Sequence, residues 1–122
     1  MAITKPVWSA EQAGTTGTIA AAGTANTDID LATNGWDVVV GLIDVTLGSS
    51  SGVTVRFFRS TDSGTSFSDE SLAGGFTITA DGVYPFDLYA EDYTRVSILN
   101  DDGANATGTI TVNYQGRNWE TV

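Results

Sequence analysis

The sequence predicts an all-β fold, a single β-sandwich of either jelly-roll or immunoglobulin-like type. Three observations support it. Thr, Gly, Ser and Val dominate the composition, whereas the strong helix formers Leu, Lys, Glu and Arg are scarce. Apolar and polar residues alternate from residue 36 onward. Turn signals recur about every 8 to 12 residues, and a chain of 122 residues corresponds to one domain.

The clearest predicted strand covers residues 36–47 and is central, because its first half is apolar on both sides. A Gly-Ser turn over 48–52 is predicted to reverse the chain into a second strand, 53–59, so that the two form a hairpin. Later strands are expected at 76–78, 83–89, 96–98 and 110–114. The side chains predicted to lie inside the sandwich are Val39, Ile43, Val55, Phe57, Ile78, Phe86, Val96, Ile98, Ile110 and Val112.

Two further segments carry weaker signals. Residues 17–32 are predicted to hold two short strands, one around Ile19 and one around Ile29 and Leu31. Pro85 lies inside a strand pattern and cannot donate a backbone hydrogen bond, so its strand is predicted to be an edge strand or a bulged one.

The first fifteen residues, 1–15, are predicted to form an extended N-terminal arm, and residues 16–122 the β-sandwich domain. Pro6 restrains the preceding residue to extended geometry, and 13–17 has the composition of a flexible join. Trp8 is costly to leave in water, so it either closes the sandwich as an edge strand or docks on a partner. The same alternatives apply to Trp119. The predicted interface residues are Lys5, Pro6, Val7, Trp8 and Trp119.

Charge and composition exclude several functions. With 15 acidic and 5 basic residues the net charge is -10, which repels phosphate backbones and anionic lipids, so neither nucleic acid nor a membrane is expected as a partner. Cys and His are absent, which excludes disulfides, Cys or His zinc sites and His-based triads. No long apolar run or secretory signal is seen, so the chain is expected to be soluble and not exported by that route. We expect no cofactor and no small-molecule substrate.

The most specific motif is Ser-Thr-Asp-Ser-Gly-Thr-Ser-Phe at 60–67. It resembles the Asp-box of sialidases and other β-propellers, with Ser in place of Thr and Phe in place of Trp. A propeller needs the box in each blade, whereas this chain has it once. In those folds the Asp caps backbone amides and the aromatic ring packs beneath a hairpin. We therefore predict a structural turn here.

Catalysis would require paired carboxylates, and the available pairs lie in inferred turns or strand ends, where solvation or turn capping explains them. We therefore expect the protein not to be an enzyme. A calcium site could be built from clustered oxygens, but the spacing lacks the Asp-x-Asp-x-Asp-Gly pattern. The carboxylate pairs are Asp28/Asp30, Asp69/Glu70, Glu91/Asp92 and Asp101/Asp102, and the calcium candidates are Asn100, Asp101, Asp102 and Asn105.

A sugar-binding face is a further alternative, because aromatic side chains can form a flat platform on a β-sandwich. Tyr89 and Tyr93 have the outward parity of their strands. An exposed aromatic patch more often marks a protein interface than a carbohydrate site. The aromatic residues considered are Trp36, Tyr89, Tyr93 and Trp119.

Taken together, the segments resemble the small β-sandwich virion proteins of tailed bacteriophages. The resemblance rests on four phrases: 8–12 (Trp-Ser-Ala-Glu-Gln), 27–31 (Thr-Asp-Ile-Asp-Leu), 56–64 (Arg-Phe-Phe-Arg-Ser-Thr-Asp-Ser-Gly) and the pattern Tyr-x-Arg-Val-x-Ile-x-Asn-Asp at 93–101. It covers roughly residues 8 to 116 and is most like a capsid decoration, or cement, protein. A phage tail or fibre module is the alternative, followed by a carbohydrate-binding β-sandwich.

This resemblance implies a protein that binds the outer capsid surface of the virion and stabilises the shell, often through a terminal arm. The implied partners are the major capsid protein and further copies of the chain, with a trimer favoured over a dimer. The protein would be made in the host cytoplasm. The family carries no catalytic residues that could be transferred to this sequence.

Overall fold

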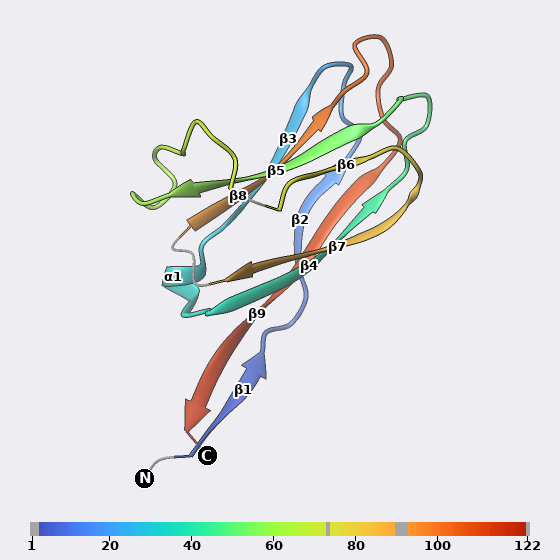
Figure 1. The fold of residues 1–122 in the computed structure, drawn as a ribbon. Helices are drawn as coiled ribbons and strands as arrows, with labels where there is room; N and C mark the ends of the chain where they lie inside the picture. Colours follow the sequence, from blue (N-terminus) through green and yellow to red (C-terminus); the bar gives the residue numbers. More distant parts are fainter. Residues whose placement is uncertain (1–2, 73, 90–92, 122) are drawn as a thin grey trace.

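The fold, described from a computed structural model for residues 3–72, 74–89 and 93–121, is a β-sandwich of two antiparallel sheets (Figure 1). Sheet A has the order β1-β9-β4-β7, with β2 also paired to β9, and sheet B has the order β3-β8-β5-β6. From β2 to β9 the chain passes from one sheet to the other at every step except β5 to β6, which are neighbours in sheet B, and this is the jelly-roll pattern. The immunoglobulin-like alternative is not the observed arrangement. The elements are β1 Thr4–Trp8, β2 Gln12–Gly17, β3 Thr24–Ile29, α1 Leu31–Asn34, β4 Val38–Val45, β5 Val53–Ser60, β6 Phe76–Ile78, β7 Gly82–Tyr89, β8 Tyr93–Asn100 and β9 Ile110–Thr121.

The core lies between the sheets and is built from inward positions two residues apart in each strand. All ten side chains predicted to be inside are buried, which confirms the strand parity read from the sequence. Gly41 leaves room for the Phe86 ring on this inner side, because a β-carbon there would lie 2.1 Å from a ring atom.

The predicted hairpin of 36–47 with 53–59 is wrong. β4 lies in sheet A and β5 in sheet B, so the Gly-Ser turn carries the chain across the sandwich rather than back along the same sheet. β4 instead pairs with β7 and β9, both distant in the sequence. Alternation shows which side of a strand is buried, and it carries no information on which strand lies beside it.

The segment 17–32 also differs from prediction. No strand forms around Ile19, which is buried in a loop, where its amide donates to the Thr107 hydroxyl at 2.9 Å. β3 ends at Ile29, and the buried Leu31 begins the short helix α1. Asp30 caps this helix by accepting a hydrogen bond from the Thr33 amide at 3.0 Å.

The predicted boundary between arm and domain, after residue 15, lies inside a strand. Residues 12–17 form β2, which pairs with β9 and has a register shift between Ala13 and Thr16. The Thr15 amide donates to the Thr27 hydroxyl of β3 at 3.0 Å, so β2 joins both sheets and closes one side of the sandwich. The Gly and Thr residues interpreted as a flexible join therefore form a bulged strand.

Both prolines lie on outermost strands of sheet A. Pro85 is in β7, the last strand of the sheet, which confirms the prediction of an edge strand. Pro6 is in β1, the strand at the other end.

Candidate functional site

The N-terminal strand pairs with the end of the chain. β1 runs antiparallel to β9, from Thr4 opposite Thr121 to Trp8 opposite Arg117. β4 accompanies β9 only as far as Arg117, so the two strands continue beyond the sandwich as a two-stranded projection (Figure 1). We call residues 4–8 with 117–121 the ribbon. All five predicted interface residues lie in it.

Directly opposed residues of an antiparallel pair point to the same side, and this divides the ribbon into two faces. On one face lie Pro6, Trp8, Arg117 and Trp119, and on the other Lys5, Val7 and Glu120. Lys5 and Glu120 form an exposed salt bridge of 3.1 Å on that second face. The structure therefore brings Pro6, Trp8 and Trp119 together and separates them from Lys5 and Val7.

Arg117 organises the first face. Its guanidinium lies 5.8 Å from the centre of the Trp8 ring and 5.1 Å from that of Trp119, both within cation–π range. Its Nε and terminal nitrogen donate to the two carboxylate oxygens of Asp37, at 3.1 and 3.0 Å. The Trp119 indole N–H donates to the same carboxylate at 2.8 Å. Asp37 precedes β4, so these bonds attach the base of the ribbon to the body.

The ionisation of these groups is coupled to that geometry. Hydrogen bonds from Arg117 and then from Trp119 lower the pKa of Asp37 to about 2. The same carboxylate raises the pKa of Arg117. Both groups therefore stay charged at neutral pH, and the network is preserved wherever Asp37 is ionised.

The aromatic surface continues from the ribbon onto sheet A. Val38 faces Arg117 on one side and Tyr89 on the other, and it is only 9% exposed although it points outward. Tyr89 itself is 61% exposed, and its hydroxyl donates to Asp87 at 3.2 Å. The Asp87 carboxylate raises the pKa of Tyr89. We call Trp8, Tyr89, Arg117 and Trp119 the aromatic patch.

The sequence did not indicate Arg117 and Asp37 as partners of the two tryptophans, and it grouped Tyr89 with Trp119 only as part of a sugar platform. The signal for Arg117 was present, because a residue two positions before Trp119 in a strand shares its face. Asp37 reaches the patch by bonding to Arg117, 80 positions away, and Tyr89 by pairing with Val38, which alternation alone does not reveal.

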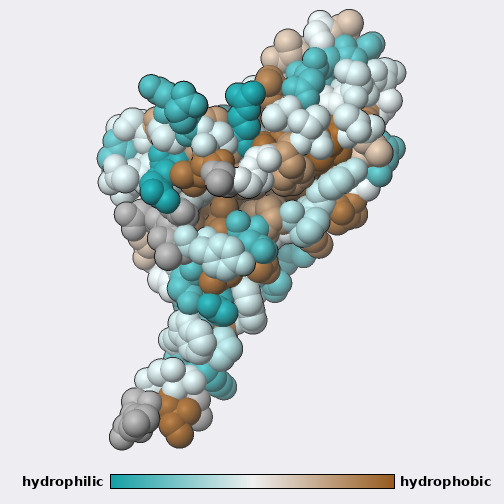
Figure 2. All heavy atoms as spheres, viewed as in Figure 1, coloured by the Kyte–Doolittle hydropathy of each residue, from teal (hydrophilic) through white to brown (hydrophobic). Residues whose placement is uncertain are grey.

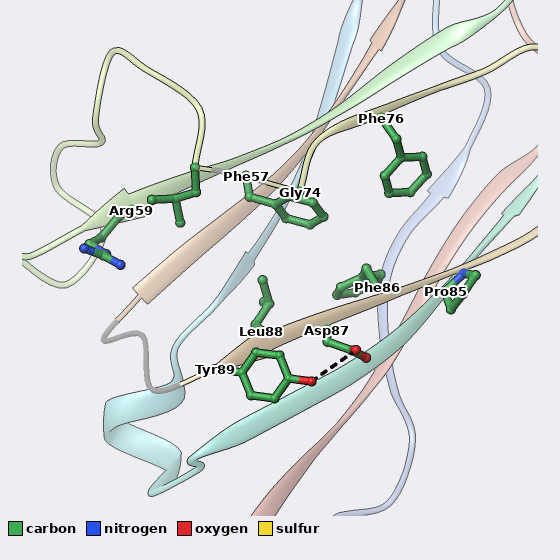
Figure 3. A pocket seen from close by; sticks show the side chains of 10 residues that line it. Phe57, Arg59, Gly74, Phe76, Pro85, Phe86, Asp87, Leu88 and Tyr89 are labelled. Atoms are coloured by element: carbon green, nitrogen blue, oxygen red, sulfur yellow. Dashed lines mark hydrogen bonds between the residues drawn. The ribbon is translucent and has the colours of Figure 1, made fainter.

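A second feature is an open cleft at the side of the sandwich opposite β2, with a volume of about 610 Å³. β6 spans only three residues, so the edge of sheet B is short beside β7. Phe57, Phe86 and Leu88 point into the cleft, with Arg59 at one end and Tyr89 at the mouth (Figure 3). Apolar side chains show in the hollow between the edges of the two sheets (Figure 2). The cleft opens onto core side chains, and the polar side chains among its lining residues are Arg59, Asp87 and Tyr89.

The four aromatic residues considered for a sugar platform do not gather on one surface. Trp36 is half-buried, lies over Gly116 and meets Tyr114 edge-on at 6.2 Å. Tyr93 packs against Phe67 at 5.9 Å, on the outer side of sheet B. Only Tyr89 and Trp119 share the aromatic patch.

The Asp-box-like segment 60–67 forms a structural turn, as predicted. Asp62 accepts hydrogen bonds from the Ser66 amide at 2.9 Å and from the hydroxyls of Ser60 and Ser66. These bonds, first that of the Ser66 hydroxyl, lower the pKa of Asp62 to about 2. Phe67 packs beneath the Arg95 guanidinium, which is 3.9 Å from its ring centre.

Structural roles also account for the residues considered as calcium ligands. The buried Asn100 amide donates to the carbonyls of Ile19, Ala20 and Asn105, and its oxygen accepts from the Ser50 hydroxyl and the Asp102 amide. Asp102 accepts from three backbone amides, which lowers its pKa.

The carboxylates considered for catalysis also have local structural roles or lie outside the described residues. Asp28 forms a bidentate pair with Arg95, Asp30 caps α1, and Glu91/Asp92 lie outside the described residues. Within residues 3–72, 74–89 and 93–121 no group of three or more acidic residues is placed to hold a metal ion. In the same ranges, no helix has the length and apolarity needed to cross a membrane.

Comparisons with known proteins give similarity at the level of fold. No family model matches the sequence, and no curated protein matches it significantly. Among solved structures, protein YomS from the SPBc2 prophage is similar, with a TM-score of 0.54 and 14% identity over 94% of this chain and 96% of that one. A chain of the cowpea mosaic virus empty particle has a TM-score of 0.51 at 9% identity, covering 93% and 84%.

The mitogen of Yersinia pseudotuberculosis is also similar, with a TM-score of 0.50 at 13% identity, covering 95% of this chain and 87% of that one. The fold thus occurs in a prophage protein and a virus shell, and also in a bacterial mitogen. At these identities the similarity establishes the fold, while function has to be argued from the surface. The chain is a jelly-roll β-sandwich, a fold that a prophage-derived protein and a chain of a virus particle also adopt.

Proposed function

We propose that this chain is a non-enzymatic decoration protein of a bacteriophage capsid, which attaches to the outer shell through the aromatic patch on its ribbon. The observation that carries the proposal is the composition of that patch together with the hydrogen bonds that hold its side chains. Trp, Tyr and Arg are the residues most enriched where protein interfaces concentrate their binding energy. Here Trp8 and Trp119 are 43% and 51% exposed on one face, and Asp37 fixes the guanidinium between them.

Preorganisation strengthens this proposal. A side chain that is already ordered loses little conformational entropy when a partner covers it. The two tryptophans stand on paired strands, and the hydrogen bond from Trp119 to Asp37 fixes its ring. Such rings contribute little to the core of the isolated domain, so their exposure is better explained by binding than by folding.

The proposed partner is the major capsid protein, and the proposed location is the outside of the virion. Several copies joined in an oligomer, for which a trimer remains the prediction, would add the effect of multivalency to individually weak contacts. A tail or fibre module would use the same patch on a different partner. Binding to purified shells, compared with binding to purified tails, separates these two functions.

The test uses shells purified from the virus that encodes the chain, stripped of this protein. Replacing Trp8 or Trp119 by Ala should weaken attachment by on the order of 2 kcal/mol per site, or roughly 30-fold, with the melting temperature nearly unchanged. Ile3→Ala is the matched control, because Ile3 is 68% exposed and its chain parity places it on the opposite face. If both Trp variants attach like the control, the proposed function is wrong.

A further inference from the structure

The outer face of sheet A carries most of the exposed apolar surface. Six large apolar side chains are exposed among the described residues, and five of them point to this side of the sheet or its ribbon. Beyond the aromatic patch these are Leu42, which is 49% exposed, and Val83, which is 56% exposed. Leu42 lies beside Pro85 in register, so the apolar strip crosses neighbouring strands. Contiguous exposed apolar surface of this kind marks an interaction site.

The same face carries a minor share of the charge. The outward positions of β4, β7 and β9 hold two carboxylates, Asp44 and Asp87, and one guanidinium, Arg117, which is a formal charge of -1. Asp37, bonded to Arg117, and Glu11, beside Leu42, add two further negative charges. The whole chain carries -10. Most acidic residues therefore lie away from this face, and covering it desolvates few charges.

The ribbon is too small to form a stable protein interface by itself. Five residues of two strands span roughly 17 by 10 Å, or about 170 Å² in projection. A stable interface buries about 800 Å² on each partner. The adjoining face of three strands with eight residues each adds roughly 400 Å² in projection, and side-chain relief raises the accessible area of both. The ribbon and the face together approach the required area.

A shallow hollow of about 300 Å³ lies on this face, lined by Val40, Leu42, Pro85 and Asn113 among others. Val40, Leu42 and Pro85 form its apolar part, Asn113 and Gln115 provide amide groups, and Glu11 and Asp87 contribute carboxylates. A hollow of this size accommodates one bulky side chain of a partner.

We propose that the shell protein is bound across the whole outer face of sheet A, with the ribbon as one end of a continuous footprint. This inference rests on the proposed function and names the surface that completes it. The partner surface would be flat and free of acidic groups, and would present one apolar side chain to the hollow. The contact is made by the face of the sheet and requires no added strand.

The experiment compares three variants for attachment to the same stripped shells. Leu42→Asp places a charge in the centre of the face, Trp8→Ala removes an anchor of the ribbon, and Thr77→Asp adds the same charge on the outer side of sheet B, where Thr77 is exposed. Leu42→Asp should weaken attachment at least tenfold, and Thr77→Asp should attach like the parent. Leu42→Thr, which removes the apolar side chain and adds no charge, should fall between them.

The outcomes separate the two proposals. If Trp8→Ala weakens attachment and Leu42→Asp behaves like Thr77→Asp, the extended footprint is wrong and the ribbon proposal stands. If neither Trp8→Ala nor Leu42→Asp weakens attachment, the proposed function itself fails.

Sedimentation of the free proteins gives a further test. If Leu42→Asp dissociates an oligomer while attachment per subunit is unchanged, the face joins copies of the chain and the inference is overturned.

Hydrogen exchange of the parent protein, free and bound to shells, should show protection in β4 and β7 on binding. Lack of such protection would also contradict the footprint, without depending on any variant.

Discussion

The sandwich body and the ribbon are ordered by different forces. In the body, residues such as Val39 and Ile98 are 0 and 1% exposed, and their burial provides the stability. In the ribbon, exposed rings are positioned by a guanidinium and a carboxylate at the surface, where ion pairs contribute little to the free energy of unfolding. The ribbon's exposed aromatic residues therefore contribute little to the stability of the body.

The largest effect is expected when a charged side chain is introduced into the core of the sandwich body. Ile98→Asp would bury an unpaired carboxylate in a domain whose whole stability is about 5–15 kcal/mol, so the variant should be unfolded at room temperature. Leu99→Asp, at the next residue on the opposite side of β8, should remain folded. Circular dichroism during heating measures both. An Ile98→Asp variant that melts like the parent would refute the placement of the core.

Truncation should locate the border between the two regions. Removing residues 2–8 deletes β1 only and should leave the melting temperature nearly unchanged, because β1 pairs with β9 beyond the point where β4 ends. Removing residues 2–17 also deletes β2, with its bonds to β9 and to Thr27, and should destabilise the domain strongly. Calorimetry measures the melting temperatures of both truncated proteins. Equal melting temperatures for the two would mean that β2 belongs energetically to the ribbon.

The far end of the body depends on a polar group rather than on apolar burial. Asn100, 1% exposed, donates to three carbonyls and accepts from the Ser50 hydroxyl at 2.7 Å. Asn100→Ala leaves these groups unpaired and should cost roughly 3 kcal/mol. Asn26→Ala, at an exposed site of β3, is the control. Urea unfolding gives both values, and similar midpoints would show that the loops do not depend on this amide.

The smallest effect is expected from acid titration of the ribbon. The folded-state pKa of Asp37, about 2, lies below the ordinary value of 3.8. Ionised Asp37 therefore stabilises the ribbon above pH 3.8, and this contribution is lost as the pH falls toward 2. Tryptophan fluorescence should report the change over that interval. Asp37→Asn should show the altered spectrum already at pH 7. A parent spectrum that changes near pH 4 or above would contradict the assigned network.

How far the sequence predicts the structure depends on the range of the interaction. Local signals succeeded: alternation identified inward residues such as Val55 and Val112, Pro85 indicated an edge strand, and Asp62 indicated a turn. Long-range pairing was not predictable, because nothing in the composition of residues 4–8 specifies residues 117–121 as their partner. The false hairpin has the same origin, since a short Gly-Ser turn is compatible with either sheet.

The candidate site shows the same limit. Trp8 and Trp119 were selected because large rings in terminal segments need an explanation, and both lie in the aromatic patch. Tyr89 joins them only because β7 and β9 both pair with β4. Lys5 and Val7 were selected by proximity in the sequence, whereas the strand period of two places them on the other face.

The two edge prolines bear on the colloidal behaviour of the protein. Proline is tolerated in a strand where its nitrogen faces the open edge, so Pro6 and Pro85 each remove a donor from one outer margin of sheet A. Sheet growth from molecule to molecule, which begins by adding a strand at such a margin, therefore lacks a donor at both ends. Crowded copies of the chain should resist fibre formation, and replacing either proline by Val would expose a margin suited to polymerisation.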